Sequence, residues 1–262
     1  ECLQLQAMNP NLCIKNDASY HDMYYMNPPA KDLSKIASSD KVKKVQKDFE
    51  ATHVRPQRLM KTLFTDEAYV KANVDEARLM RRLFDLACNM QSHDTDMQLY
   101  SLFTDEECYD LWSCNNLYWY LTHACSPVTD GLMPYREADL LRNILDRADA
   151  ALKEGKNQAT LRFGHESCLL PLVALLELNH YGESYPDVEK LSEQWRAYDI
   201  FPMASNVQFV FFHKKGSNDV LVKVLLNEKE TKLPVKTDVA PYYHWKDVES
   251  YYREKLNKYQ HM

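Results

Sequence analysis

Glycine scarcity is the feature of this sequence that most limits the folds open to it. The 262 residues include five glycines, and none occurs before Gly131. Tight hairpins and glycine-rich phosphate loops need backbone at positive φ, which glycine adopts at the lowest cost. The first half of the chain is therefore poorly suited to a β-barrel, a β-sandwich or a dinucleotide-binding fold. Glycine is a weak helix former, so its absence is most compatible with helices.

The composition argues against two classes of function. The formal net charge is −6, which disfavours a nucleic-acid-binding protein. No apolar run reaches the ~18 residues that a membrane span requires. Residues 41–82 differ from the rest, because eleven Lys and Arg stand there against six Asp and Glu. Such a segment on an acidic protein indicates local attraction of an anion, and the alternative is a solvated helix face.

Apolar residues recur every three or four positions in the first part of the chain. This spacing predicts helices over residues 33–50, 75–91, 105–124 and 135–153. Gly155 is expected to end the last of them as a C-terminal cap. A pattern of Leu-Phe-Thr-Asp-Glu also occurs twice, with its threonine at Thr65 and at Thr104. We expect each threonine to cap the start of a helix, with the acids in its first turn.

After Gly155 the pattern changes to short apolar runs between turns. The expected elements are a strand at 158–163, a helix at 166–178, strands at 207–212, 220–226 and 233–235, and a helix at 245–259. The predicted fold class is α/β: a mainly helical unit, residues 1–155, precedes a unit, residues 156–262, with an incomplete sheet. Three or four strands are few for an α/β domain. We therefore expect this to be part of a longer protein, consistent with its start at Glu1 without Met.

One short segment combines the residue types that phosphate chemistry needs. In Leu161–Ser167 a strand is expected to turn at Gly164 into a helix, which would place His165 and Glu166 at the strand's carboxyl end. The helix N-terminus offers free N–H groups to an anion, and Arg162 offers a guanidinium. A histidine can hydrogen-bond a phosphoryl oxygen, and a carboxyl group can protonate a leaving alkoxide. The alternative is a structural corner with a core histidine and a glutamate that stabilises the helix dipole.

The segment Arg162–Leu176 (RFGHESCLLPLVALL) closely resembles the C-terminal catalytic motif of the histidine acid phosphatases, in the branch that cleaves inositol polyphosphates such as phytate. Residues 17–27 (DASYHDMYYMN), residues 202–212 (PMASNVQFVFF) and residues 220–230 are similar to this branch as well. Together these matches extend over most of the chain.

The resemblance implies a two-step phosphomonoester hydrolysis. In this family a histidine in an N-terminal Arg-His-Gly-x-Arg-x-Pro motif is phosphorylated, while the second histidine and several arginines hold the phosphate. His165 matches the second histidine, and a neighbouring carboxylic acid protonates the leaving group. No Arg-His-Gly occurs in this sequence, so we expect the chain to be truncated and inactive by itself. The resemblance implies no metal and no cofactor.

The motif departs from the family pattern after the histidine. The inositol-polyphosphate branch usually has His-Ala-Glu and other branches have His-Asp, whereas this chain has His165-Glu166-Ser167. Glu166 is the expected proton donor, since a serine cannot supply that proton at neutral pH. A glutamate has one more methylene than the aspartate of other branches. We expect this longer side chain to affect regiospecificity and rate more than the reaction class.

The expected partner is a small phosphorylated molecule. The family's helical domain supplies cations to outer phosphates, and the matching candidates here are His53, Arg55, Arg58 and Lys61, with Arg55 and Arg58 on one helix face. Asn206, before a strand, is a further candidate for phosphate binding. The resemblance also implies a periplasmic or secreted protein. The alternative function is a non-catalytic remnant of the phosphatase fold that binds anions or partners.

Overall fold

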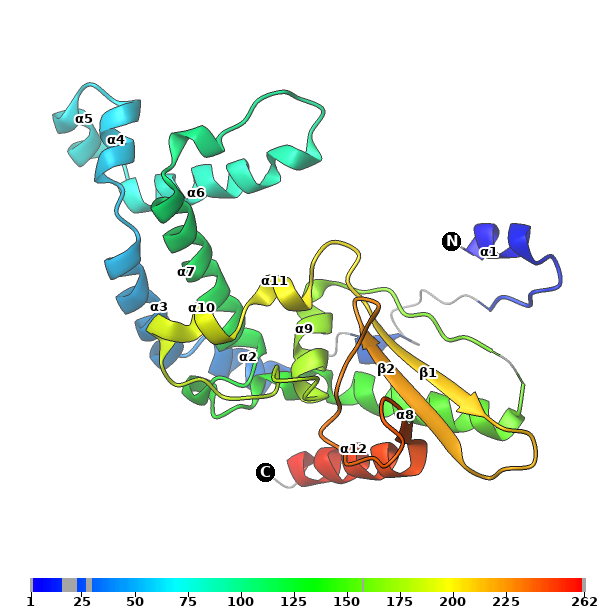
Figure 1. The fold of residues 1–262 in the computed structure, drawn as a ribbon. Coiled ribbons are helices and arrows are strands. Elements are labelled where there is room, and N and C mark those ends of the chain that lie inside the picture. The colour runs from blue at the N-terminus through cyan, green and yellow to red at the C-terminus, as the bar shows by residue number, and fades with distance from the viewer. Residues whose placement is uncertain (1, 16–22, 27–29, 157, 261–262) are drawn as a thin grey trace.

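The computed structural model describes residues 2–15, 23–26, 30–156 and 158–260. Its helices are α1 (Cys2–Met8), α2 (Lys31–Ala37), α3 (Asp40–His53), α4 (Gln57–Leu63), α5 (Glu67–Asn73), α6 (Glu76–Asn89), α7 (Asp105–His123), α8 (Ala138–Glu154), α9 (Glu166–Leu175), α10 (Leu191–Gln194), α11 (Ala197–Ile200) and α12 (Trp245–Gln260). Its strands are β1 (Val207–His213), β2 (Val220–Leu226), β3 (Lys229–Glu230) and β4 (Tyr243–His244). The fold is α/β, with a helical part that precedes a small sheet (Figure 1). Of the segments that carry the family resemblance, residues 17–27 lie largely outside the described residues.

The long helices of the first half are confirmed, with two differences. Residues 33–50 form two helices, α2 and α3, because Ser39 adopts extended backbone and its hydroxyl accepts a hydrogen bond from the Val42 N–H. A 3-10 turn, Met133–Glu137, leads into α8 and delays its start to Ala138. Gly155 ends α8 with a left-handed φ of 64°, as a C-terminal glycine cap does.

The two copies of Leu-Phe-Thr-Asp-Glu cap their helices differently. Thr104 forms a full capping box at the start of α7: its hydroxyl accepts from the Glu107 N–H, and the Glu107 side chain accepts from the Thr104 N–H. In the other copy Asp66, one residue after Thr65, is the cap of α5, and it accepts from the Tyr69 N–H at 2.9 Å. The expectation for Thr65 was therefore wrong. The carboxylate of Asp66, one residue later in the sequence, caps this helix instead.

The sheet is antiparallel throughout. β1 pairs with β2 from Val207↔Leu226 to His213↔Val220, which confirms the expected hairpin, and β3 and β4 both pair with β2. The strand expected at 233–235 was wrong, because the Leu233 N–H donates to the Tyr243 hydroxyl instead of to a neighbouring strand. The strand expected at 158–163 was also wrong. That segment has no adjacent strand in the described part of the chain, and a strand needs a pairing partner.

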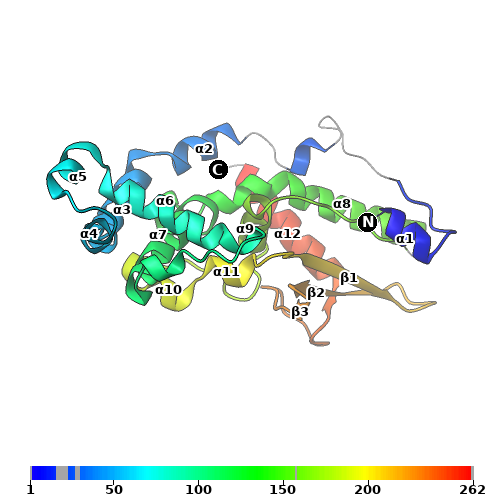
Figure 2. The ribbon, with the colours of Figure 1, turned by 90° about the horizontal axis from the view of Figure 1, so that it is seen from above.

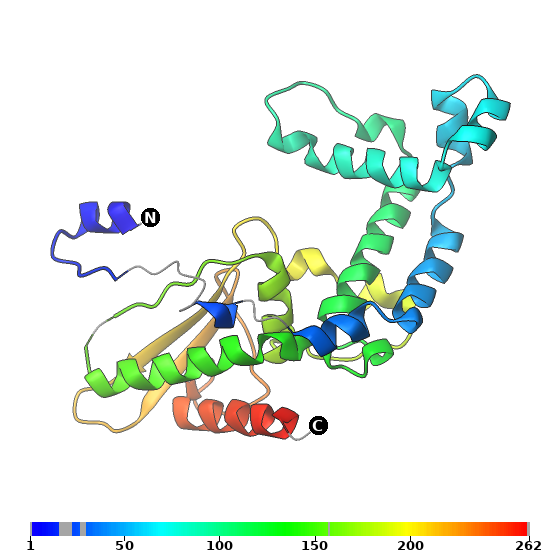
Figure 3. The same ribbon diagram turned by 180° about the vertical axis from the view of Figure 1, so that it is seen from behind.

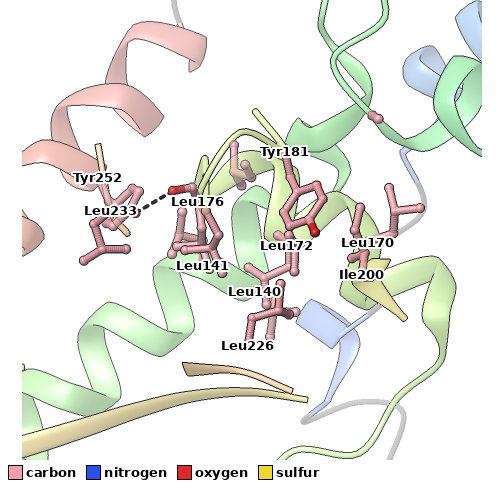
Figure 4. Packing of buried hydrophobic residues seen from close by; sticks show 14 of the residues in the cluster. Leu140, Leu141, Leu170, Leu172, Leu176, Tyr181, Ile200, Leu226, Leu233 and Tyr252 are labelled. Atoms are coloured by element: carbon pink, nitrogen blue, oxygen red, sulfur yellow. Dashed lines mark hydrogen bonds between the residues drawn. The ribbon is translucent and has the colours of Figure 1, made fainter. Parts of the chain in front are cut away.

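Most buried apolar side chains belong to one cluster that joins the helical part to the sheet. α9 lies at its centre: Leu170 and Leu172, with Leu176 just after the end of the helix, pack among side chains of α8, β2 and α12 (Figure 4). A second, smaller cluster is formed by α4, α5, α6 and the first turns of α7. These helices lie at the end of the molecule away from the sheet (Figures 1 and 3). The domain boundary at residue 155 stays a prediction, and α7 and α8 share the core of the sheet.

The C-terminal helix α12 fixes the positions of α8 and α9. The Tyr252 hydroxyl donates to the Leu176 carbonyl at 2.7 Å, and Lys255 Nζ donates to the Leu175 carbonyl at 2.6 Å. These bonds satisfy carbonyls that a helix end leaves without an intrahelical partner. Arg253 makes ion pairs to α8, to Asp146 at 2.9 Å and Asp149 at 2.8 Å. α12 packs against both α8 and the sheet (Figure 2).

Replacing Thr104 with Ala is expected to lower the free energy of unfolding by about 1 kcal/mol, because it removes the capping box of α7. Thr65→Ala is the matched control and is expected to change it by less than ~0.5 kcal/mol. Asp66→Ala is expected to cost about as much as Thr104→Ala. Urea denaturation followed by circular dichroism measures all three. Equal losses for Thr65 and Thr104 would contradict the assignment of the caps.

Candidate active site

An open cleft of about 2060 Å³ lies between α8, the segment that joins α8 to α9, and β1. The joining segment, residues 158–165, runs back from the end of α8 to the start of α9 (Figure 1). Four of the expected site residues line this cleft, namely Arg162, His165, Glu166 and Asn206. The structure therefore places the central motif and Asn206 at one cleft, and their roles in a site stay a prediction.

His165 and Glu166 mark the start of α9. His165 is the N-cap residue, and its carbonyl accepts from the N–H groups of Cys168 at 3.0 Å and Leu169 at 3.1 Å. Both side chains are exposed at the cleft. The first N–H groups of a helix have no intrahelical acceptor and carry partial positive charge. This helix end therefore offers a phosphoryl group N–H donors beside an imidazole and a carboxyl group.

Gly164 packs closely against Met26, and it does not adopt the special backbone angle that a tight glycine turn would use. Its φ lies outside the left-handed region, and a Cβ at this position would lie 3.3 Å from Met26 Cε. The Cys168 thiol also reaches this contact and donates to the Met26 carbonyl at 3.2 Å. Met26 thus lies against the first turn of α9, and a Cβ at position 164 would require its terminal methyl to shift by a few tenths of an ångström.

Arg162 lies three residues before His165, and α8 holds its guanidinium in place. Its Nη2 donates to Asn143 Oδ1 of α8 at 2.7 Å, and its side chain is half-buried. Burial lowers the pKa of Arg162, while nearby Tyr25 acts in the opposite direction. Its buried Nε has no hydrogen-bond partner in the described part of the chain. An anion in the cleft would supply an acceptor for this guanidinium.

Asn206 lines the cleft, but other protein groups already use its amide. Its Nδ2 donates to Glu228 Oε1 at 2.6 Å, and its Oδ1 accepts from Gln208 Nε2 at 2.9 Å. Its backbone N–H donates to Asn227 Oδ1 at 3.1 Å. Asn206 therefore fixes the loop that enters β1 against the turn after β2.

The four other expected binding residues do not line the cleft. His53 stacks on Phe49 with ring centroids 3.8 Å apart, and its Nδ1 lies 2.9 Å from the Phe49 carbonyl oxygen. Its Nε2 is 3.6 Å from Glu189 Oε2. Lys61 is exposed in the last turn of α4.

Arg55 and Arg58 hold the helical part together. Arg58 makes a bidentate pair with Glu107, from Nε at 2.8 Å and from Nη2 at 2.5 Å. This pair lowers the pKa of Glu107. Arg55 Nη2 lies 2.9 Å from Glu106 Oε1 and also donates to Asp110. The shared helix face expected for Arg55 and Arg58 was wrong, because Arg55 lies in the link between α3 and α4 and not in a helix.

Three further cations line the cleft, and the sequence analysis did not predict them. They are Arg147 of α8, Lys156 after the end of α8, and Lys214 after β1. The acids that line the cleft are Glu166 and Asp219. Arg147 could have been found, because it follows Asn143 by one helical turn and so lies on the same face of the predicted helix. Lys156 and Lys214 could not have been predicted, because their positions at the cleft depend on the tertiary fold.

Glu137, at the start of α8, is a buried acid beside the first turns of α9. It is 2% exposed, and its Oε2 has no hydrogen-bond partner among the described residues. Burial raises the pKa of Glu137 to about 8, although Arg136 acts against this. The carboxyl group is therefore protonated in the folded protein at neutral pH.

Among the described residues, no group of three or more His, Cys, Asp or Glu is arranged to hold a metal ion. Within the same residues, no helix is both long enough and apolar enough to cross a bilayer.

Comparison with known proteins identifies the family. Residues 10–227 match the model of the histidine phosphatase superfamily, branch 2. The chain therefore belongs to branch 2 of the histidine phosphatase superfamily. A human relative, multiple inositol polyphosphate phosphatase 1, is 28% identical over 134 residues, which are 46% of this chain and 27% of the relative.

Solved structures of a Bifidobacterium longum multiple inositol polyphosphate phosphatase share the fold. The complex with phosphate has a TM-score of 0.60 at 19% identity, over 92% of this chain and 60% of that one. The complex with inositol hexasulfate has a TM-score of 0.55 at the same identity, over 92% and 59% of the two chains. The chain thus spans about three fifths of these structures and a smaller share of the human relative.

Glu137→Gln is expected to make the protein more stable at neutral pH. An acid whose folded pKa is raised binds more protons folded than unfolded, so stability falls as pH rises from 4.5 to about 8. The slope is about 1.4 kcal/mol per pH unit, and the glutamine variant lacks it. Urea denaturation at pH 5 and pH 7.5 is therefore expected to separate the two proteins by about 3 kcal/mol more at the higher pH.

Glu154→Gln, at the exposed end of the same helix, is the control and is expected to keep the pH dependence of the wild type. A Glu137→Gln variant that follows the wild type at both pH values would contradict a protonated Glu137.

Proposed function

We propose that the chain contributes the phosphate-binding histidine and the proton donor to a phosphatase that acts on inositol polyphosphates such as phytate. The observation that carries this proposal is the exposed pair His165-Glu166 at the N-terminus of α9, which lies at a cleft with Arg162 in a histidine phosphatase chain. The relatives named for this activity support the substrate class. The phosphorylated histidine would come from an Arg-His-Gly-x-Arg-x-Pro segment, which this sequence lacks.

His165 and Glu166 have separate roles in the proposed reaction. The imidazole of His165, the guanidinium of Arg162 and the free N–H groups of α9 bind the phosphoryl oxygens and neutralise their charge. The nucleophilic histidine forms an N–P bond while the P–O bond to the inositol breaks. Glu166 gives its proton to the leaving oxygen. Its carboxylate then takes a proton from the water that cleaves the N–P bond and releases phosphate.

The outer phosphates of an inositol polyphosphate need further cations. Arg147, Lys156 and Lys214 already line the cleft, which favours them for this role. Of the residues proposed from the helical part, Lys61 is exposed, whereas His53 is stacked on Phe49. Arg55 and Arg58 would first have to release their carboxylate partners, which costs the energy of those pairs. We also propose that the protein is periplasmic or secreted, as the resemblance of its motifs to the phosphatase branch implies.

A second proposal is a non-catalytic module that binds an anion in the same cleft. The sequence favours it through the lack of Arg-His-Gly and through Ser167 in the place of the usual glutamate. Measuring phosphate release from phytate distinguishes the phosphatase proposal from the module proposal. The phosphatase proposal expects release from a protein that joins this chain to the missing motif, and none from the 262 residues alone. The module proposal expects phytate binding without release in both.

His165→Ala in such a joined protein is expected to reduce phosphate release from phytate at least ~100-fold, because it removes a donor to the transferring phosphoryl group. Circular dichroism checks that the fold is kept. His93→Ala, an exposed histidine outside the cleft, is the control and is expected to retain activity. Near-normal activity of His165→Ala would rule out the role assigned to this histidine.

Glu166→Gln is expected to affect substrates according to their leaving groups. The variant cannot donate a proton, so hydrolysis of phytate is expected to fall by about 100-fold or more. The p-nitrophenolate anion leaves without protonation, so release from p-nitrophenyl phosphate is expected to fall far less. The measurement is kcat on both substrates, with Ser167→Ala as the control at the next position. Equal losses on both substrates would show that another group is the acid.

A further inference from the structure

We propose that His244 is a pH-sensitive latch for the strap, which is the segment of residues 231–242 between β3 and β4. In weak acid the latch holds the strap to the hairpin of β1 and β2, and above neutral pH it releases the strap. The proposal does not depend on phosphatase activity. His244 ends β4, pairs with Leu221 of β2, and is followed directly by α12. The hairpin, the strap and the start of α12 therefore meet at one imidazole.

Both ring nitrogens of His244 face carboxylates. Nδ1 lies 3.0 Å from Asp219 Oδ1 and 3.1 Å from Asp219 Oδ2, in the loop between β1 and β2. Nε2 lies 2.9 Å from Asp238 Oδ1, in the strap. An ionised carboxylate only accepts hydrogen bonds, so each nitrogen must carry a proton for both bonds to exist. The arrangement therefore selects the positively charged imidazole.

The other charged side chains nearby do not replace these two contacts. Lys223, on the neighbouring strand β2, donates from Nζ to Glu230 at 3.0 Å. His213, at the end of β1, has its Nε2 2.8 Å from the Ser217 carbonyl oxygen. The remaining charged residues on the adjoining loop, strap and first turn of α12 are Lys214, Lys215, Lys236, Lys246 and Asp247. Among the described residues, the ion pairs of His244 are those with the two aspartates.

The charge of the imidazole sets the pH range of the latch. The hydrogen bonds to Asp219 and Asp238 raise the pKa of His244 above its usual 6.5. The contribution of the latch is therefore complete below about 6.5 and is lost as pH rises through the folded pKa. The bond to His244 also lowers the pKa of Asp238 from 3.8, so this carboxylate stays ionised in weak acid. The latch is closed between these limits.

Deprotonation breaks one of the two contacts, because a neutral imidazole keeps a single N–H. Asp219 faces Nδ1 with both of its oxygens, whereas Asp238 faces Nε2 with one. The side chain of Asp238 is also the more exposed, at 82% against 53% for Asp219. The remaining proton therefore stays on Nδ1 toward Asp219. The strap is the part that is released.

Two amides inside the strap report on its release. The Val239 N–H donates to Thr237 Oγ1 at 3.3 Å, and the Tyr242 N–H donates to the Val239 carbonyl at 3.0 Å. The test measures their hydrogen exchange by NMR in the full chain at pH 5.5 and pH 8.5, as protection relative to an unstructured peptide at the same pH. The titration of the His244 ring protons, assigned with His244→Gln, is followed in the same samples.

We expect the protection of both amides to fall about 2- to 5-fold between the two pH values, the range that an exposed ion pair supports. The titration midpoint of His244 is expected to lie above 6.5. Asp238→Asn is expected to lower this midpoint and to give weak protection at both pH values. His213→Gln, which changes the other histidine of the hairpin, is the matched control and is expected to behave as the wild type.

Asp219→Asn separates a latch from a merely structural contact. With an amide beside Nδ1, the neutral ring can keep its proton on Nε2, where Asp238 accepts it. The strap of this variant is therefore expected to remain protected at pH 8.5, although the midpoint of His244 falls. Three results would overturn the proposal: a wild-type midpoint at or below 6.5, strap protection that does not change with pH, or a loss of protection at pH 8.5 in Asp219→Asn equal to that of the wild type.

Discussion

The burial of α9 is the interaction on which the rest of the structure depends. Its side chains from Leu170 to Leu175 lie almost wholly inside the main cluster, and each buried leucine contributes about 1.5–3 kcal/mol. α8, α12 and β2 pack around it, and α12 also satisfies the carbonyls at its C-terminal end. Because one end is fixed in the core, the other end presents His165 and Glu166 to the cleft on a rigid base. The site is thus an outcome of packing at the centre of the molecule.

Two groups of cations in the chain lie in different surroundings. Arg55, Arg58 and Arg253 lie in ion pairs that join one helix or link to another. Arg147, Lys156 and Lys214 line the cleft instead. The sequence does not show which of these cations are in ion pairs and which line the cleft, because all six are simply basic residues in it. Carboxylates brought close by the fold make the distinction, because a paired guanidinium is no longer free for an anion.

The family membership and the open cleft are consistent with each other. Branch 2 of the histidine phosphatases matches most of this chain, and the solved relatives continue beyond it. The segment at 158–163 has the sequence of a strand but pairs with no strand in the described residues. Leu161 and Phe163 in this segment are exposed.

The sequence by itself determined the long helices of the first half apart from the break at Ser39, the hairpin of β1 and β2, and the motif at 162–166. These features depend on local spacing, caps and turns, which neighbouring residues decide. It could not determine whether 158–163 forms a strand, because pairing depends on a partner from elsewhere. It also could not show which basic residues face the cleft or that Glu137 is buried. Only the tertiary structure decided these, since burial and charge pairing arise between segments far apart in the chain.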